Sequence, residues 1–512
     1  MPTNYAYAYG NGTTGIEYRR PEYQEALTRW LSVDDTQKGQ QRIKCMGEFY
    51  LPFFGTQVRP SSSFGCPEDY RSYMMDYNSL TAQESARYIN YLKRAVFYNY
   101  ISPTVGGLVG LATKEPLEFE ADEGLEFARD NIDGAGTTLE QQYKRTTELV
   151  IKHGRAGILV DFPQIEGAAS QEDVNNGLAR PYSTVYTAEQ IINWGEGRVG
   201  ADKRVNLVVL AEIQWNRAEN GYDLEAEIQY RVLRLVDGLY TQEVRNDSDE
   251  IIEGPFEPTD ATGQRLDFIP FQFIGAVNND VEIDESKMYD MAAINLGHYI
   301  NSADYENCAW LAGQVIPWGS GFDKSWVDRN MPGGIQLGSG SFVAVPDGET
   351  FGLAQAKPNV MSFEAMGHKQ TQMVAMGAKM VDPSGSFDSA TEAVINSQSE
   401  KSFLQSVMGN VDSAYTQVLE WIGLFAGAEL EKFNNPTDLN IVLADPQMFA
   451  QVMASFTMGI TPRRAVLEYE RKIGVLEMTD EEVEDEVEDD TSGLLDNVET
   501  TVTPTVGAND NG

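Results

Sequence analysis

The sequence predicts an α+β protein that is mainly helical, and three observations carry that prediction. Apolar residues recur at three- and four-residue steps over 285–311, 361–381 and 388–429, a spacing that places them on one face of a helix. The section 182–275 instead holds runs rich in Val, Ile and Tyr, which favour strands. A Gly- and Pro-rich section, 313–358, separates two of the long helices. The predicted architecture is therefore a set of long helices, a strand-rich sheet and a small module between two helices.

The composition allows a large core and excludes some classes of protein. The chain has 512 residues, of which 42 % are hydrophobic, enough for several domains. Lys and Arg number 38 against 78 Asp and Glu, which gives a formal net charge of −40. A protein that grips nucleic acid over most of its surface needs a basic balance, so that class is excluded. No apolar run reaches the roughly 18–20 residues of a spanning helix, and the polar N-terminus does not read as a signal peptide, so we expect no membrane contact.

The first third of the chain is predicted to alternate helices and loops. Residues 1–20 are rich in Gly, Asn, Tyr and Thr with no hydrophobic period, which indicates a flexible arm. We expect Pro103 and the pair Gly106-Gly107 to interrupt or redirect the second helix, and Gly154 to end the third. The patterns predict helices over 20–44, 81–101 and 137–153, and a buried strand over 156–160.

The middle of the chain is predicted to be mostly strand. The step Asp237-Gly238 is typical of a two-residue hairpin turn. The stretch Tyr186–Trp194 predicts a short helix ahead of the sheet. Strands are expected over 205–215, 225–238, 239–246 and within 269–280, with two short strands, 314–317 and 340–345, in the Gly/Pro-rich module.

A search for chemistry along the chain finds no catalytic signature. The phosphate-loop, H-E-x-x-H, C-x-x-C and G-x-S-x-G patterns are all missing from the sequence. His153 is best explained as the end of a helix, where the negative end of the dipole favours it, and Asp280, Asp284 and Glu285 lack the spacing of a calcium loop. We therefore expect no catalytic residue, no metal and no cofactor. The chain has three widely spaced cysteines, Cys45, Cys66 and Cys308. This number and spacing fit neither a disulfide framework nor a zinc site, and they suit a reducing cytoplasm.

The C-terminus is predicted to be a solvated, disordered tail. Residues 480–490 hold nine carboxylates and no base, a composition that cannot bury enough apolar surface to order itself. Residues 479–512 carry 12 carboxylates and no Lys or Arg, so the rest of the chain still carries −28. The body of the protein is therefore acidic in its own right.

Six stretches, taken in order along the chain, carry a family resemblance. They are 50-YLP-52, 91-YLKRAVFYNYISPTVGGLVGLATKEP-116, 153-HGRAGILVDFP-163, 269-IPFQFIG-275, 289-YDMAAINLGHYINSADYENC-308 and 389-SATEAVINSQSEKSFLQSV-407. They are spread over most of the range 45–425. In this order they resemble the portal (head-to-tail connector) proteins of tailed bacteriophages, in particular a portal-like family formerly of unknown function.

The resemblance implies a homo-oligomeric ring, typically of twelve subunits, at one vertex of a capsid. Double-stranded DNA would pass through this ring during packaging and ejection. The implied partners are the terminase large subunit, the major capsid protein and head–tail adaptor or tail proteins, and the implied location is the virion after assembly in the host bacterial cytoplasm. A protein of this family is structural, so no enzymatic activity and no cofactor are expected.

The resemblance also implies a layout of wing, stem, clip and crown. The N-terminal arm (1–20) and the acidic tail (479–512) fall outside it. The segments are a wing over 21–283 with its β-rich section 182–275, a first stem helix 285–311, a clip 313–358, a second stem helix 361–381, a tunnel loop 382–388, a long wing helix 388–429 and a crown 445–478. Residues expected at stem or inter-subunit contacts are Met288, Ala292, Leu296, Tyr299 and Ala303. Residues expected to face DNA are Lys379, Asp382, Pro383, Ser384, Gly385, Ser386, Phe387 and Asp388.

The charge fits a passage for DNA, and two other functions stay open. An acidic channel repels the phosphate backbone and keeps DNA mobile, whereas Lys and Arg would hold it by counterion release; acidic chains are also simply soluble. One alternative is another structural adaptor or scaffold protein of a phage or large assembly, although adaptors are usually much shorter. The other is a carboxylate-dependent hydrolase or nuclease, for which the sequence offers no spaced cluster of Asp, Glu and His.

Overall fold

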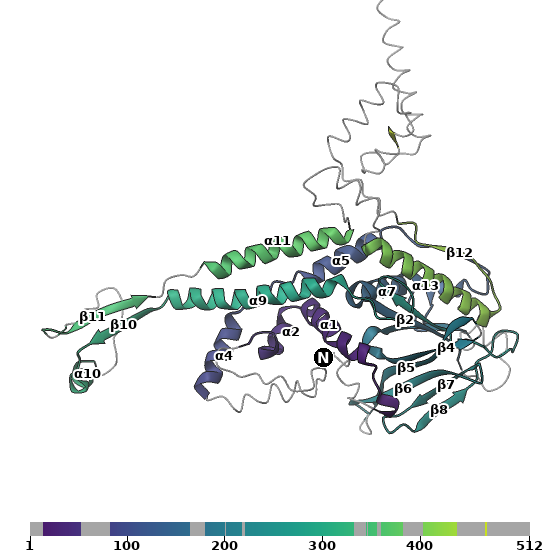
Figure 1. The fold of residues 1–512 in the computed structure, drawn as a ribbon, viewed down its shortest axis with the longest axis horizontal. Coiled ribbons are helices and arrows are strands. Elements are labelled where there is room, and N and C mark those ends of the chain that lie inside the picture. Colours follow the sequence, from purple (N-terminus) through teal and green to yellow (C-terminus); the bar gives the residue numbers. More distant parts are fainter. Residues whose placement is uncertain are drawn as a thin grey trace, which may run out of the picture. The chain divides into compact units, whose positions relative to one another are not determined.

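The fold is α+β, as predicted, and is shown by a computed structural model (Figure 1). The structure describes residues 14–52, 82–163, 180–199, 201–217, 221–331, 345, 347–355, 360–381, 403–437 and 466–467. The chain divides into two compact units, Met1–Thr437 and Asp438–Gly512. The helices and strands described here all belong to the first unit. The predicted crown, 445–478, and the acidic tail lie outside the described residues apart from residues 466 and 467.

The first unit combines short and long helices with antiparallel sheets. The helices are α1 (Pro21–Lys38), α2 (Gln40–Cys45), α4 (Ala82–Arg94), α5 (Ile101–Ala112), α6 (Phe127–Asp130), α7 (Leu139–His153), α9 (Lys287–Ala312), α10 (Lys324–Asn330), α11 (Met361–Val381) and α13 (Phe403–Ala426), with 3-10 turns η2 (Gly15–Glu17), η3 (Gly47–Phe49) and η5 (Ala188–Gln190). The strands are β1 (Glu118–Ala121), β2 (Arg155–Asp161), β3 (Tyr182–Thr187), β4 (Ile191–Val199), β5 (Asp202–Arg217), β6 (Leu224–Val236), β7 (Leu239–Arg245), β8 (Ile251–Phe256), β9 (Phe271–Gly275), β10 (Val315–Ser320), β11 (Thr350–Gln355) and β12 (Leu430–Asn434). None of the described helices is both long and apolar enough to cross a membrane.

Local sequence signals set the ends of the helices that position the rest. Thr138 caps α7 in a capping box with Gln141, and Gly154 ends the helix with a φ of 71°, which only glycine adopts without strain. The Ser286 hydroxyl accepts a hydrogen bond from the Met288 backbone and starts α9. The predicted helices 137–153 and 285–311 are thus confirmed within two residues.

The helix predicted over 81–101 is two helices joined by an extended turn. α4 ends at Arg94, and α5 starts at Ile101 and contains Pro103 and the Gly106-Gly107 pair. The expectation that these residues interrupt the helix was wrong. Pro103 lies in the first turn, where backbone N–H groups have no intrahelical partner to lose. Burial of Val105, Leu108 and Val109 on either side of the glycines holds them in the helix.

The short helix predicted over Tyr186–Trp194 was also wrong. Only the 3-10 turn η5 interrupts two strands there, although Thr187 and Gln190 form a capping box that normally opens a longer helix. Ile191 and Ile192 are fully buried at the start of β4. Their burial in the sheet outweighs the local helical signal.

Two antiparallel sheets form the body. One has the order β4-β5-β6-β7-β8 and the other β3-β2-β9. Asp237 and Gly238 both have positive φ and close the β6–β7 hairpin in register Val236↔Leu239, as predicted. All seven residues of β2 are buried, because α7 and α13 pack against this sheet.

A further pairing joins distant parts of the chain. β1 pairs antiparallel with β12, with Phe119 opposite Phe433. The long wing helix predicted over 388–429 is seen as α13, which ends at Ala426 and is followed by Gly427 at a φ of 68°. Residues 388–402 lie outside the described part of the chain. β12 was not predicted.

Candidate functional site

The first candidate site is the α9–α11 segment, residues 287–381. α9 and α11 pack side by side (Figure 1), and β10 pairs with β11 between them in the chain. Gln355 Nε2 donates to the Ala312 carbonyl at 2.6 Å, which ties the hairpin to the end of α9. α10, which the sequence did not predict, begins where the Asp323 carboxylate accepts two backbone N–H groups. The second strand expected in this module, 340–345, lies outside the described residues except for its last residue.

The residues predicted at contacts between subunits are mostly core residues of their own chain. Met288, Ala292, Tyr299 and Ala303 have no exposed surface, and Leu296 is half-buried. Leu296, Tyr299 and Ala303 pack in one hydrophobic cluster with residues of α2 and α4. Ile43 comes from α2, and Tyr88 and Tyr91 come from α4. A contact between copies therefore has to use the exposed side of the segment. A charge at Leu296 would disturb folding before it disturbed assembly.

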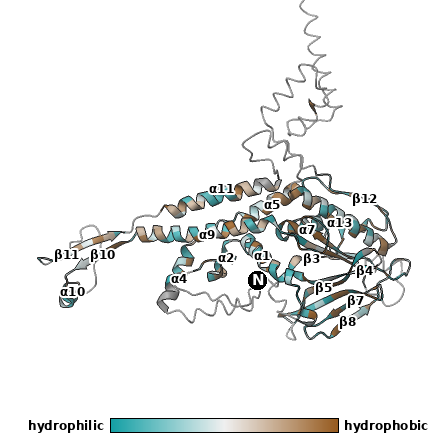
Figure 2. Ribbon diagram, viewed as in Figure 1, coloured by the Kyte–Doolittle hydropathy of each residue, from teal (hydrophilic) through white to brown (hydrophobic). Residues whose placement is uncertain are grey.

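The exposed side of the segment is rich in large apolar residues. It carries 13 of the 25 large hydrophobic side chains that are exposed among the described residues. Figure 2 shows hydrophobic stretches along α9, α11 and the hairpin. We call this set the apolar surface of the segment: Tyr289, Trp310, Leu311, Val315, Ile316, Trp318, Val327, Val345, Leu353, Val360, Met361, Phe363 and Val374.

The residues predicted to face DNA are outside the part of the chain that the structure describes. Asp382 through Asp388 lie in the undescribed stretch 382–402. Lys379 lies in the last turn of α11, and its side chain is not described. Their role therefore stays a prediction.

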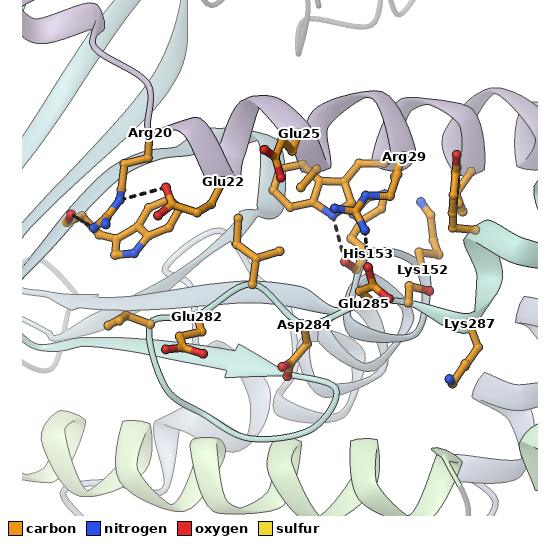
Figure 3. Close-up of a pocket in the computed structure, with 18 of the residues that line it drawn as sticks. Arg20, Glu22, Glu25, Arg29, Lys152, His153, Glu282, Asp284, Glu285 and Lys287 are labelled. Carbon is orange, nitrogen blue, oxygen red and sulfur yellow. Dashed lines mark hydrogen bonds and ion pairs between the residues drawn. The ribbon is translucent and has the colours of Figure 1, made fainter.

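A second candidate site is a pocket of about 520 Å³ beside the start of α9 (Figure 3). α1, the end of α7 and the loop 281–286 line it. Arg29 crosses the pocket and pairs with Glu285 at 2.5 Å, while Arg20 pairs with Glu22 at 3.4 Å. Charged groups of both signs are therefore mixed along its wall.

The loop that leads into α9 is held by a buried arginine. Arg155 has 1 % of its surface exposed, and its Nη1 donates to the carbonyls of Val281 and Glu282 at 2.9 and 3.0 Å. Its guanidinium lies over Trp194 at 4.2 Å from the ring centroid. Burial lowers the pKa of Arg155 to about 9, against the opposing effect of Asp280 and Asp284. A cation shielded this way fixes the base of α9.

Asp284 and Glu285, two of the carboxylates that lack calcium-loop spacing, contact other residues of the chain. Asp284 Oδ2 accepts the backbone N–H groups of Val277 and Asn278 at 2.7 and 3.2 Å. Glu285 pairs with Arg29. Both side chains therefore make local contacts that hold the loop before α9.

A buried cluster at the end of α7 joins three elements that are far apart in the sequence. His153 Nε2 lies 3.1 Å from Asp34 Oδ1 on α1 and 3.7 Å from Glu189 Oε1 on η5. Lys152 Nζ lies 2.7 Å from the same Asp34 oxygen. Burial alone would raise the pKa of Asp34, but the neighbouring His153 and Lys152 hold it far below its usual range. His153 ends its helix as predicted; its two carboxylate neighbours were missed, because no local spacing links them.

A polar network on the neighbouring sheet is fully paired. Arg231 Nε and Nη2 donate to the two Glu212 oxygens at 2.7 and 3.2 Å, and Tyr186 and Gln229 donate to the same carboxylate at 2.6 and 3.0 Å. Burial would raise the pKa of Glu212, but Arg231 outweighs it and the pKa is lowered. A carboxylate whose lone pairs are all engaged is a structural group rather than a general base.

Comparison with known proteins places the α9–α11 segment in a recognised domain. Residues 287–426 match a domain of unknown function (DUF4055). No curated protein matches the chain.

Three solved structures are similar to the chain at low identity. One is described as the virion of a native gene transfer agent (GTA) particle, with 12 % identity, a TM-score of 0.37, and coverage of 76 % of this chain and 93 % of that chain. The neck of the empty GTA particle, computed with C6 symmetry, gives 13 %, 0.36, 73 % and 90 %. The neck of the native GTA particle, computed with C12 symmetry, gives 13 %, 0.36, 73 % and 89 %. At these TM-scores the likeness is too weak to carry a conclusion.

Proposed function

We propose that this chain is a structural protein of a phage head or neck and, more specifically, the portal protein. Copies of the chain would form a ring at one capsid vertex, and double-stranded DNA would pass through this ring during packaging and ejection. The single observation that carries the proposal is the apolar surface of the α9–α11 segment. It lies on the two long helices and the strand-bearing module that the family resemblance assigns to stem and clip.

Burial of this surface explains why copies of the chain would associate. Apolar area removed from water contributes about 25 cal/mol per Å², and monomeric proteins rarely expose apolar surface on this scale without a partner. α9 and α11 each bury one side within the chain and leave Trp310, Phe363 and Val374 exposed by 48, 59 and 62 %. Identical copies supply identical segments, so a head-to-tail contact between them closes into a ring when the rotation allows it.

The negative charge supports a passage for DNA rather than a grip on it. The chain carries −40, and an acidic lining repels phosphates and keeps the duplex mobile. Lys379 and the segment 382–388 are proposed to meet the DNA. The terminase large subunit, the major capsid protein and adaptor or tail proteins are the proposed partners, and no enzymatic activity is proposed.

Imaging of the purified full chain tests the ring directly. We expect closed annuli in negative-stain microscopy and a particle mass near twelve subunits. A sample that remains a single subunit at every concentration contradicts the proposal. Deletion of Ser384–Ser386 is expected to leave the rings intact but to impair packaging, and normal packaged DNA length in that variant contradicts the tunnel assignment.

A further inference from the structure

The cluster at the end of α7 has the composition and spacing of a metal site. We propose that Asp34, His153 and Glu189 bind one divalent transition metal ion of the zinc type. One ligand atom from each residue lies within 4.8 Å of the other two. Nothing in this proposal depends on ring formation, so it stands or fails separately from the proposed function.

The distances fit tetrahedral coordination. Ligand atoms bound at about 2.0–2.1 Å to tetrahedral zinc lie roughly 3.3 Å apart. His153 Nε2 lies 3.1 Å from Asp34 Oδ1 and 3.7 Å from Glu189 Oε1, on either side of that value. The two carboxylate oxygens lie within 4.8 Å of one another, so they can close around one ion by small side-chain movements, and one coordination position stays open.

The donor set selects the metal. An imidazole nitrogen with two carboxylates suits zinc and its transition-metal neighbours, whereas magnesium and calcium prefer oxygen alone. The His153 and Glu189 side chains are 1 and 5 % exposed and that of Asp34 is 17 % exposed. The site is thus shielded but reachable, because His153 lines the pocket of Figure 3.

Charge in the cluster is uneven between the two carboxylates. Asp34 pairs with Lys152 at 2.7 Å and also interacts with Lys38 by charge, whereas the ion pair that the described residues give to Glu189 is the 3.7 Å contact with His153. A metal ion would therefore mainly offset the charge of Glu189. Lys152 would repel the metal ion. It would also keep its hydrogen bond to the Asp34 carboxylate, and such outer contacts to ligands are common at metal sites.

One feature limits the affinity. His153 Nδ1 is buried and has no hydrogen-bond partner among the described residues. A metal-bound neutral imidazole carries its proton on that atom, and loss of an outer acceptor typically costs about 10–100-fold in affinity. We therefore expect binding weaker than in a structural zinc site.

The site would act as a clamp between three elements. Asp34 belongs to α1, His153 to the end of α7 and Glu189 to η5. The next residue, Gly154, is in close contact with the loop that starts α9, since an added Cβ there would lie 2.4 Å from the Asp284 carbonyl. Metal binding would therefore stiffen the base of the α9–α11 segment.

Cobalt absorption of the full-length protein tests the proposal. Titration with Co²⁺ is expected to give the intense visible bands of a tetrahedral site at one ion per chain, and Zn²⁺ is expected to abolish them. Zn²⁺ is also expected to raise the melting temperature, because a ligand that binds only the folded state stabilises it. Weak octahedral absorption alone, as from exposed carboxylates, overturns the proposal.

Variants separate this site from the general acidity of the pocket. Glu189→Gln is expected to weaken Co²⁺ binding at least about tenfold, and Glu282→Gln, an exposed carboxylate on the same pocket, is the matched control and should leave it unchanged. Lys152→Met should tighten binding about tenfold by removing a like charge. Equal weakening by both glutamine variants, or no gain from Lys152→Met, overturns the proposal. Circular dichroism of each variant confirms that it is folded.

Discussion

Replacement of Phe363 by Ser should weaken assembly of the chain while leaving its fold intact. Phe363 lies in the first turns of α11 and is 59 % exposed. Its ring touches Tyr305 on α9 at a centroid distance of 5.7 Å. Phe and Ser have similar helix propensities, so the change removes apolar surface without a direct effect on the helix.

The magnitude follows from the exposed area. A phenylalanine side chain buries about 200 Å² at most, so 59 % exposure leaves about 120 Å² available to a neighbouring subunit. At about 25 cal/mol per Å², full burial would contribute ~3 kcal/mol per contact. That value corresponds to about 100-fold in the association constant of each contact. The unfolding free energy of the subunit should change by less than ~1 kcal/mol, since the lost contact with Tyr305 is a single exposed ring pair.

Sedimentation of a concentration series measures the effect as a shift of the assembly midpoint. Ile252→Ser is the matched control, because Ile252 is 51 % exposed but lies on β8, outside the α9–α11 segment. We expect a large shift for Phe363→Ser and none for the control. An unchanged midpoint for Phe363→Ser would show that this part of α11 is not at a contact. An equal shift for Phe363→Ser and Ile252→Ser would show that the effect is not specific to the α9–α11 segment.

Three further substitutions test the interior by urea unfolding. Gly154→Ala should cost ~2 kcal/mol or more, because φ is 71° and the added Cβ meets the Asp284 carbonyl at 2.4 Å; an unfolding midpoint equal to wild type would contradict this. Glu212→Gln should cost ~2–3 kcal/mol at neutral pH by removing the closer of the two carboxylates that pair with Arg231, since Asp161 lies farther away at 3.8 Å. Since the folded pKa of Glu212 is lowered from 4.5, its contribution is present above that pH and is lost as pH falls below it, so the deficit should shrink in acid. Asn435→Ala should cost ~2 kcal/mol or more by removing three buried hydrogen bonds. The Asn435 amide donates to the Ala112 carbonyl at 2.8 Å and to the Tyr143 hydroxyl at 3.1 Å, and its oxygen accepts from the Thr437 backbone at 3.1 Å. No loss of stability would show that water replaces them.

Much of the fold could be predicted because its signals are local. The stop at Gly154 and the turn at Asp237-Gly238 each need only neighbouring residues to be recognised. The period of α9 likewise appears within its own sequence. These elements are where the sequence-based predictions and the structure agree.

The errors arose where tertiary contacts decide. Residues 186–194 carry a helix-start signal, but burial of Ile191 and Ile192 draws them into strands. β12 forms only because β1 lies beside it. Tyr299 was expected at a contact between helices or subunits, and the residues of α2 and α4 that pack against it within the chain could not be identified from the period of α9. The contact between subunits stays a prediction. Periodicity identifies an apolar face but not the element that covers it.

The pairing of β1 with β12 has a consequence for the order of folding during synthesis. β1 is complete at Ala121, but its partner ends at Asn434, so at typical ribosome speeds of about 5–20 residues per second the strand waits many seconds for its neighbour. α13, which packs on β2 and β9, also emerges late. The α9–α11 segment therefore leaves the ribosome before the body beneath it has closed. On polysomes, neighbouring nascent chains would therefore expose the apolar surface of this segment before synthesis is complete. Slow translation downstream of residue 381 would favour premature aggregation of these chains.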